Sequence, residues 1–288
     1  MLKSRIAPTP SGFLHPGNGL SFLMTWVKTR EANGQLLLRI DDLDKQRYRQ
    51  EYVEDIFRTL DWLGIDYDEG PSSVEDFEKN WSQHHRLDTY IKAVDELKEN
   101  RLLFACECSR KQRREDAIAN GHRQYSGRCM EKNIPLHTPN VALRITLPES
   151  DLKLTMQLEK RNEQRPFSSI DNFVVNQKNG LPAYQIASLL DDTLYQINYI
   201  VRGEDLRPSS WYQLALAHLL NIESFRQTTF WHHPLLNDDD GIKLSKSKGA
   251  GSLKDWRENG QSPKKMIQLA AKFMGKDEKI DNIKDLTG

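Results

Sequence analysis

Apolar positions near the start of the chain change from one periodicity to another within about 40 residues. Residues 4–7 form a short strand-like segment. Across residues 20–27 apolar side chains recur at i, i+3, i+4 and i+7, which predicts a helix with one apolar face. Asn33-Gly34 predicts the end of this helix, and residues 35–40 form a mostly apolar run typical of a buried parallel strand. The pattern therefore predicts a βαβ unit.

The same helical periodicity recurs twice before residue 100. It predicts one helix over residues 53–63, closed by Gly64, and another over residues 87–97. Residues 102–166 then change character, because they hold all three cysteines, a basic cluster and a strand-like run at 141–147. We interpret this stretch as an insertion between two halves of a nucleotide-binding fold.

Beyond the insertion the apolar pattern is again regular. It predicts a strand at 173–175 that ends in a tight turn at Asn179-Gly180, a helix over 184–190 and a buried strand over 196–201. A helix capped by Ser209 or Ser210 then runs to Leu220. A strand at Phe230-Trp231 and small helices from Ser252 onward complete the pattern. We therefore expect four parts: residues 1–101 and 167–235 as the two halves of a Rossmann-like domain, 102–166 as the inserted subdomain, and 236–288 as a lysine-bearing loop followed by C-terminal helices.

Composition narrows the class of protein. The chain has 288 residues, is 38% hydrophobic and carries a formal net charge of +0. It has no run of the roughly 18 apolar residues that a membrane span needs, and no apolar stretch typical of a signal peptide near Met1. Three cysteines indicate the reducing cytoplasm rather than a disulfide framework. Any basic surface must be local, and the segment from Arg110 to Arg128 is either such a surface or a solvated helix face.

Two short segments carry candidate nucleotide chemistry. In residues 5–18, RIAPTPSGFLHPGN, the His-Pro-Gly-Asn run falls where the first strand leads into the first helix, and phosphates bind well at such helix N-termini. His15 can donate a hydrogen bond to phosphate, Gly17 allows close backbone approach, and Asn18 can cap the helix or contact the nucleotide. Alone, a His-x-Gly sequence is more often a simple turn.

The second segment is Lys243-Leu244-Ser245-Lys246-Ser247, bracketed by Gly241 and Gly249. Its two lysines can bring ammonium groups to a leaving pyrophosphate, and the flanking glycines favour a loop that closes on ATP. A lysine-rich loop alone is usually only solvated. The two segments occur together, with a βαβ pattern behind the first, and this combination favours a nucleotide site.

The cysteines are arranged as Cys106-Glu107-Cys108 with Cys129 downstream. A Cys-x-Cys pair with a later cysteine suits a tetrahedral zinc site that lacks one ligand, and His122 is the fourth ligand that chemistry alone favours. Three ordinary reduced thiols are the alternative. A zinc ion here would be structural, because the insertion has a thin core of its own.

These motifs resemble known ones. The His15 and Lys243 segments are similar to the HIGH and KMSKS motifs of class I aminoacyl-tRNA synthetases. Residues 5–12 resemble the R-F-A-P-S-P-[ST]-G opening of glutamyl- and glutaminyl-tRNA synthetases, residues 39–44, RIDDLD, resemble their R-I-E-D-T-D, and residues 201–206, VRGEDL, resemble their [IV]-R-G-x-D-L. The chain ends soon after the Lys243 segment, and this plan is similar to the glutamyl-Q tRNA(Asp) synthetase family.

The resemblance implies an α/β fold: a class I synthetase Rossmann-like parallel sheet with an inserted zinc-bearing α+β subdomain and a short helical C-terminal part. It implies a ligase that activates L-glutamate with ATP and Mg²⁺, without tRNA, and transfers it to the queuosine base in the anticodon stem-loop of tRNA(Asp). His15, Lys243 and Lys246 would act in catalysis, and His15, Gly17, Asn18 and Lys246 would bind ATP.

Family positions also imply the residues that contact glutamate: Arg5, Ala7, Thr9, Asp41, Tyr184 and Arg202. A planar guanidinium at Arg5 or Arg202 can hold a carboxylate in two places, although Arg202 could instead form an internal salt bridge to Glu204 or Asp205. The chain has Asp41 where the family has Glu, the group that receives the α-ammonium. Its shorter arm could act through water or a backbone shift, or could change the amino-acid preference.

For the metal, the family pattern C-x-C…Y-x-x-x-C implies Cys106, Cys108, Tyr125 and Cys129 as zinc ligands, with Tyr125 in place of His122. Two other functions stay open. The chain could charge a tRNA 3′ end, or it could be a non-catalytic paralogue that binds amino acid or RNA, and ATP turnover would separate the latter from both enzymes. We expect no membrane partner and a monomer.

Overall fold

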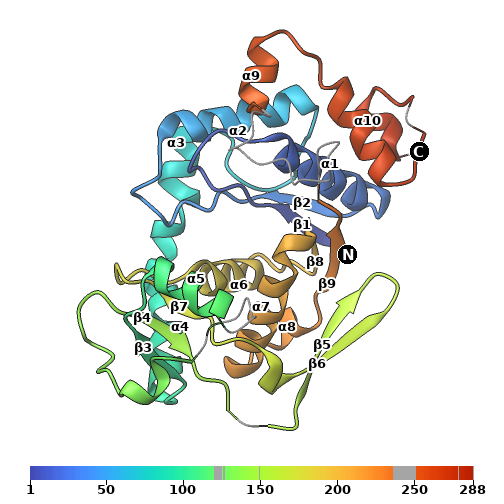
Figure 1. Cartoon of the computed structure of the whole chain (residues 1–288). Helices are drawn as coiled ribbons and strands as arrows, with labels where there is room; N and C mark the ends of the chain where they lie inside the picture. Colours follow the sequence, from blue (N-terminus) through green and yellow to red (C-terminus); the bar gives the residue numbers. More distant parts are fainter. Residues whose placement is uncertain (120–124, 126, 149, 236–250, 278, 288) are drawn as a thin grey trace. The chain divides into compact units, whose positions relative to one another are not determined.

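The computed structural model of the chain describes residues 1–119, 125, 127–148, 150–235, 251–277 and 279–287 (Figure 1). The chain forms two compact units. Unit 1 contains Met1–His85, Ile197–Arg207 and Thr229–Gly288, and unit 2 contains Arg86–Gln196 and Pro208–Thr228. Unit 2 is thus inserted within the sequence of unit 1. The four-part division expected at residues 101, 166 and 235 stays a prediction.

Unit 1 is built on parallel strands. β1 pairs in parallel with β2, and β8 pairs in parallel with β9. β8 lies beside β1, where the backbone N–H of Asn198 donates to the Lys3 carbonyl at 3.1 Å. The expected parallel sheet is therefore confirmed. The strands of this unit are β1 (Lys3–Ile6), β2 (Gln35–Leu38), β8 (Tyr199–Gly203) and β9 (Thr229–His233).

Helix α1 (Pro16–Glu31) forms the centre of unit 1, packed on β1, β2 and β8 (Figure 1). Leu23, Met24 and Val27 are fully buried, and the buried Thr29 satisfies its hydroxyl by donating to the Thr25 carbonyl at 2.7 Å. Gly19 allows close packing, since a Cβ there would lie 2.8 Å from Leu253 Cδ1. The helix that the first apolar stripe predicted is therefore the core of the unit.

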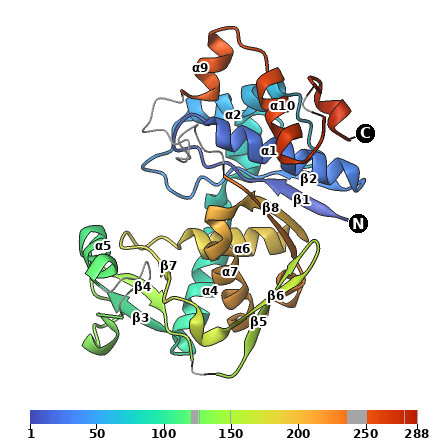
Figure 2. The same ribbon diagram turned by 45° about the vertical axis from the view of Figure 1, so that its right-hand side comes forward.

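The other helices of unit 1 surround α1. α2 ends at Gly64, whose φ of 74° lies in the left-handed region that favours glycine. The helices are α2 (Gln50–Leu63), α3 (Val74–Asp76), a π-helix (Phe77–Trp81), the short helices Gln83–Arg86 and Glu204–Leu206, α9 (Leu253–Glu258), α10 (Lys264–Phe273) and Ile283–Thr287. α10 and the last short helix pack on α1 (Figure 2), so both contribute to the same core.

Unit 2 combines helices with two antiparallel pieces of sheet. β4 pairs with β3 on one side and β7 on the other, and β5 and β6 form a hairpin. Its elements are α4 (Leu87–Glu99), β3 (Leu103–Cys106), α5 (Arg110–Ala119), Met130–Lys132, β4 (Ala142–Ile145), β5 (Lys153–Leu158), β6 (Asn162–Pro166), Phe167–Ser169, β7 (Val174–Asn176), α6 (Tyr184–Leu194), α7 (Arg207–Leu219, from residue 208 onward) and α8 (Glu223–Arg226).

A buried ionic network joins two of these helices. Arg86 donates from Nε to Asp191 Oδ1 at 2.8 Å, and the hydroxyl of Tyr90 donates to the same oxygen at 2.6 Å. Asp191 is fully buried, and its charge is tolerated because the guanidinium and the phenol satisfy it. This network pins α4 to the C-terminal half of α6.

Two sequence expectations differ from the structure. Neither Ser209 nor Ser210 caps a helix, because α7 begins at Arg207 and Pro208 fits its first turn. The strand expected over 196–201 runs over Tyr199–Gly203, because Gln196 has a φ of 58° that ends the preceding helical segment. Within the part of the chain that the structure describes, no helix is both long and apolar enough to span a membrane.

Candidate nucleotide and amino-acid site

The carboxyl ends of the parallel strands of unit 1 meet at one edge of the sheet. Beyond β1 and β2, pairing continues through the backbone: Arg39 N–H donates to the Ile6 carbonyl at 2.9 Å, and Asp41 N–H donates to the Pro8 carbonyl at 2.8 Å. Ligands of open α/β sheets bind at such an edge. The two segments that carry candidate glutamate-binding residues are therefore held side by side there.

The residues proposed from β1 lie in a graded environment. Arg5 is in the strand and is 5% exposed, Ala7 is half-buried just past its end, and Thr9 is exposed. A buried guanidinium next to small, more exposed residues suits a substrate whose carboxylate binds the Arg5 guanidinium while the rest of the substrate lies against the more exposed Ala7 and Thr9.

Asp41 forms a bidentate ion pair with Arg39. Arg39 Nε donates to Asp41 Oδ1 at 2.6 Å, and Arg39 Nη2 donates to Oδ2 at 3.1 Å. The Arg39 side chain is 1% exposed and that of Asp41 is 7% exposed. The guanidinium fixes the plane of the carboxylate, so the shorter arm of Asp41 is held in one orientation. Neighbouring Asp42 is held separately, accepting from Ser82 Oγ at 2.6 Å and Gln83 N at 2.7 Å.

Arg202 lies one residue before the carboxyl end of β8 and is 3% exposed. In the parallel register it faces His232 of β9, and its guanidinium carbon lies 5.3 Å from the centre of the Phe230 ring. Burial, and then the positive charges of Arg202 and Arg207, lower the pKa of His232 to about 3. His232 is therefore neutral at physiological pH. Glu204, one proposed partner for Arg202, is paired with Arg207 at 3.0 Å.

His15 immediately precedes α1. Its backbone N–H donates to Asn18 Oδ1 at 3.1 Å, so Asn18 caps the start of the helix. A Cβ on Gly17 would lie 2.9 Å from His15 Cε1 and 3.0 Å from Nδ1, so the imidazole ring packs directly on this glycine. The motif thus places a polar ring at a helix N-terminus, where free N–H groups and the helix dipole favour a phosphate.

Lys243 and Lys246, with their flanking glycines, lie outside the described residues, as does His122. The chain on either side of residues 236–250 belongs to unit 1. On one side β9 ends at His233, and on the other Leu253 N–H donates to the Leu14 carbonyl at 2.8 Å. The first described residues after this gap are therefore anchored by the backbone to the residue before His15. Tyr184, the last glutamate candidate, is the first residue of α6 in unit 2 and is 40% exposed.

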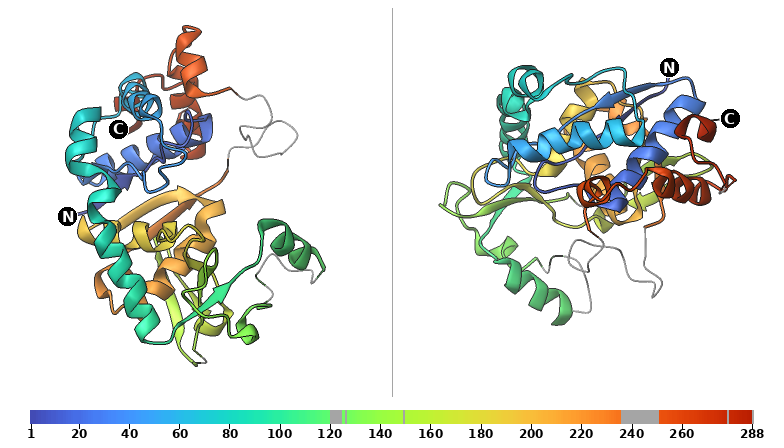
Figure 3. Two further views of the ribbon diagram at one scale, coloured as in Figure 1. Left: turned by 90° about the vertical axis from the view of Figure 1, so that its left-hand side faces the viewer. Right: turned by 90° about the horizontal axis from the view of Figure 1, so that it is seen from above.

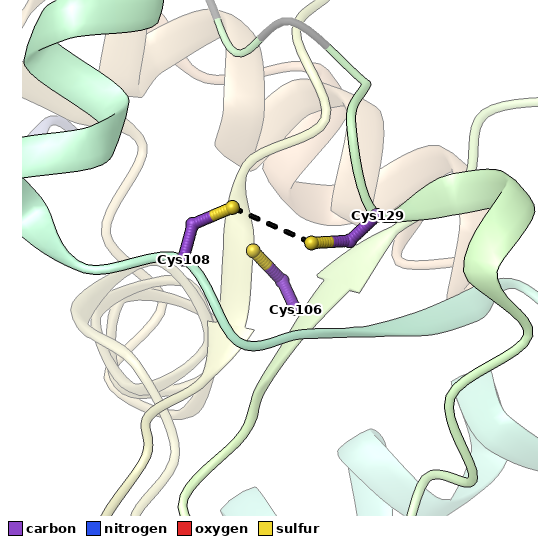
Figure 4. A group of neighbouring side chains, drawn as sticks. All are labelled: Cys106, Cys108 and Cys129. Carbon is purple, nitrogen blue, oxygen red and sulfur yellow. Dashed lines mark hydrogen bonds between the residues drawn. The ribbon is translucent and has the colours of Figure 1, made fainter.

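The three cysteines come together in unit 2 (Figure 4). Their sulfur atoms lie within 4.8 Å of one another, Cys108 Sγ is 3.4 Å from Cys129 Sγ, and all three residues are buried. Cys106 ends β3, Cys108 follows in the next turn, and Cys129 precedes a short helix. Three converging soft sulfur donors fit Zn²⁺ and suit a hard cation poorly.

Tyr125 lies at this cluster, as the family pattern implied. Its hydroxyl is 3.4 Å from Cys106 Sγ and 4.0 Å from Cys108 Sγ, and it accepts from the Cys129 N–H at 2.9 Å. Burial raises the pKa of Cys106, but hydrogen bonds with the Tyr125 hydroxyl and the Cys108 N–H, with Arg144 nearby, outweigh it and lower that pKa to about 7. Burial and contact with the thiols raise the pKa of Tyr125.

The structure brings the four predicted metal-site residues into contact, and it places the nucleotide and glutamate candidates that it describes in unit 1, apart from Tyr184. The unit 1 candidates lie within or just beyond β1, β2 and β8 or at the start of α1: Arg5, Ala7, Thr9, His15, Gly17, Asn18, Asp41 and Arg202. In unit 2 the residues that lie together are Cys106, Cys108, Tyr125 and Cys129. Sequence reasoning missed Arg39 and His232. A charged residue inside an apolar run was the available signal for Arg39, whereas His232 is found only through strand register.

Comparison with known proteins places this geometry in a family. Residues 1–288 match the family described as tRNA synthetases class I (E and Q), catalytic domain. The chain is 32% identical over 278 residues to the glutamate–tRNA ligase of Symbiobacterium thermophilum, covering 93% of this chain and 57% of that protein. It is 33% identical over 276 residues to that of Xylella fastidiosa strain M12, covering 94% and 56%. The chain therefore spans little more than half the length of these relatives.

Solved structures show the same fold. The glutamate–tRNA synthetase of Elizabethkingia anophelis superposes with a TM-score of 0.76 at 21% identity, covering 99% of this chain and 65% of that one. The glutamate tRNA ligase of Elizabethkingia meningosepticum, in complex with its amino acid, gives a TM-score of 0.75 at 22% identity, covering 99% and 64%. The family match covers the whole sequence, and the chain belongs to the class I tRNA synthetases of the E and Q type, as their catalytic domain.

Proposed function

We propose that this chain activates glutamate with MgATP to form glutamyl-adenylate without RNA, and transfers the glutamyl group to the queuosine base in the anticodon of tRNA(Asp). The residues near the strand ends of unit 1 are the observation that supports the activation step. There the buried cations Arg5 and Arg202, the oriented carboxylate of Asp41 and the His15 helix start belong to one compact unit. The choice of acceptor rests on the resemblance of the motifs.

In the proposed reaction a glutamate carboxylate oxygen attacks the α-phosphorus of ATP and pyrophosphate leaves, so no protein nucleophile is required. The guanidinium of Arg5 or Arg202 binds the side-chain carboxylate in two places, and Asp41 receives the α-ammonium. His15 donates to a phosphate oxygen at the start of α1. Lys243 and Lys246 stabilise the charge that develops on pyrophosphate.

The neutral state of His232 suits this arrangement. A second cation beside Arg202 would add electrostatic repulsion to a region that already holds a buried guanidinium, and the lowered pKa of His232 prevents this. His232 therefore adds no positive charge beside Arg202 at physiological pH.

The cysteine cluster supports a structural zinc ion held by Cys106, Cys108, Cys129 and Tyr125. When bound, zinc would supply a rigid tetrahedral crosslink and no catalytic chemistry, because four protein ligands leave no open position. The cluster joins the end of β3 to the segment around Cys129, so the metal would stabilise a subdomain of short strands.

A second function is favoured by one specific finding. The curated relatives cited above are named glutamate–tRNA ligases. An enzyme of that kind joins glutamate to a tRNA 3′ end, and in this second function the chain catalyses the same transfer.

The deciding experiment is ATP–pyrophosphate exchange with each amino acid in turn, first without RNA and then with tRNA. Exchange with glutamate alone supports the proposal, and exchange that appears only with tRNA supports 3′-end charging. Exchange with another amino acid would mean that Asp41 has changed the substrate, whereas no exchange under any condition would indicate a non-catalytic paralogue. Cleavage of the labelled tRNA(Asp) and location of the glutamate on either its anticodon fragment or its 3′-terminal fragment then separates the two acceptors.

Lys246→Ala tests the role of the second motif. We expect it to slow adenylate formation far more than it weakens ATP binding, because the lysine acts on charge that appears in the transition state. Lys272→Ala, an exposed lysine of α10, is the matched control and should change neither quantity. Equal losses of binding and rate in Lys246→Ala would contradict a transition-state role.

A further inference from the structure

Helix α5 is unusual because none of its described side chains is buried. It begins just after Cys108, and Ser109 and Gln112 cap it reciprocally: Gln112 N–H donates to Ser109 Oγ at 3.1 Å, and Ser109 N–H donates to Gln112 Oε1 at 2.8 Å. Within unit 2 it stands apart from α4 and α6 (Figures 2 and 3). Packing of an apolar face normally provides most helical stability, and the side chains of α5 that the structure describes form no such buried face.

The charges of α5 do not cancel locally. Its two acids are each paired with a base, Glu115 with Lys111 at 3.8 Å and Asp116 with Arg128 at 3.5 Å. Arg110, Arg113 and Arg114 have no carboxylate partner among the residues that the structure describes. Because the whole chain has a net charge of +0, this group of three arginines is a local feature and not part of a generally basic surface.

The three arginines are spaced at i, i+3 and i+4, so they lie on one side of the helix. Arg110 and Arg114 are exposed and Arg113 is half-exposed. Guanidinium groups present a planar fork of donors that matches phosphate in two places, whereas a lysine offers a single point charge. Three adjacent forks suit a run of phosphates better than a single anion.

We propose that the arginine face of α5, made by Arg110, Arg113 and Arg114, binds the phosphate backbone of an RNA. The proposal rests on the proposed function in one respect, since the RNA is the acceptor of the activated amino acid. An α-helix cannot enter the deep, narrow major groove of A-form RNA, so α5 contacts the backbone from outside or at an open loop. The helix starts two residues after Cys108 of the cysteine cluster.

The test uses the full chain and a fluorescent stem-loop RNA with the anticodon-arm sequence of tRNA(Asp), with binding measured by anisotropy between 50 and 200 mM salt. The variant is Arg110→Gln/Arg113→Gln/Arg114→Gln. The matched control is Lys111→Gln on the same helix, whose charge is already compensated by Glu115. ATP–pyrophosphate exchange with glutamate and no RNA is measured on all three proteins, together with their thermal midpoints.

Each phosphate contact contributes about 0.7 to 0.9 to the slope of log K against log salt, so the triple variant should lose about two to three units of slope. The ratio of the RNA affinity of the wild type to that of the triple variant should accordingly fall by about 20- to 40-fold between 50 and 200 mM salt. Lys111→Gln should change the slope little, and RNA-independent exchange should be unchanged. Arg→Lys at all three positions should keep most of the slope, because it keeps the charge.

An unchanged affinity and slope in the triple variant would overturn the proposal, as would an equal loss in Lys111→Gln. A failure of the proposed function looks different. RNA binding through the arginines without exchange for any amino acid would refute activation and leave the RNA surface intact, whereas exchange with glutamate and no RNA binding would refute the surface alone.

Discussion

The Arg39–Asp41 pair gives the sharpest prediction for unit 1. Arg39→Met removes one partner of a bidentate pair whose side chains are 1% and 7% exposed and whose bonds are 2.6 and 3.1 Å long. The carboxylate of Asp41 would then be buried without its guanidinium. Breaking a buried pair in this way costs about 3–5 kcal/mol of unfolding free energy, far more than the pair itself contributes. For a unit of this size the thermal midpoint should fall by about 6–20 °C.

The assay is a double-mutant cycle on chemical unfolding, with Arg39→Met, Asp41→Asn and the double variant. The double variant should lose less than the two single losses added together, with a coupling of at least about 1.5 kcal/mol, because it leaves neither charge buried alone. Arg58→Met is the matched control. Its pair with Glu54 is 3.4 Å long and its side chain is 65% exposed, so the loss should stay below about 0.5 kcal/mol. Additive single losses, or a loss at Arg39 no larger than at Arg58, would refute the reasoning.

Gly17→Ala should displace the His15 ring, because the new Cβ would lie 2.9 Å from His15 Cε1. In steady-state exchange, kcat/KM for ATP should fall by about tenfold or more. In thermal melting, the midpoint should change by only a few degrees. Zinc analysis should find about one equivalent in the wild type and none in Cys108→Ser, and the variant should have a lower thermal midpoint. A wild type that contains no metal and is as stable as Cys108→Ser would remove the zinc proposal. The pKa of His232 is lowered from 6.5 to about 3, so its contribution to stability is complete above pH 6.5 and declines as the pH falls toward 3. His232→Gln should therefore reduce the slope of the unfolding free energy against pH, between pH 6 and 4, by up to about 1.4 kcal/mol per pH unit. An unchanged slope would contradict the lowered pKa.

The sequence predicted the elements of unit 1 well wherever one physical rule dominated. The apolar stripe over residues 20–27 and the stop at Asn33-Gly34 gave α1 and its end, and Gly64 gave the end of α2. The predicted element boundaries were wrong where the backbone preference of one residue competed with the pattern of apolar positions. Pro208 started α7 ahead of the serines, and the left-handed Gln196 delayed β8. The β5–β6 hairpin was not predicted, since its second strand, Asn162–Pro166, is polar throughout.

The candidate site was predictable as a set of residue types, less so as a geometry. Motif order identified His15 and Arg202, and the structure places each near the end of a parallel strand or the start of a helix. The bidentate hold of Arg39 on Asp41 could not be predicted, because two positions that are two residues apart in a regular strand share a face without any rule that their side chains bond. Tyr125 joined the cysteines only through the family pattern, since the chemistry of the ligands favoured His122.

The close fit of α1 against the C-terminal helices has a practical consequence for dissecting this protein. Leu253 is seated against Gly19, and Met266 and Ile283 lie in the same core as α1 and α2. A recombinant fragment that stops before residue 251 would leave this apolar surface bare to water and prone to aggregation. Split-protein complementation, in which residues 251–288 are supplied in trans as a synthetic peptide, should instead restore a soluble unit 1, and it would allow side chains of the C-terminal helices to be changed by peptide synthesis without recloning the core.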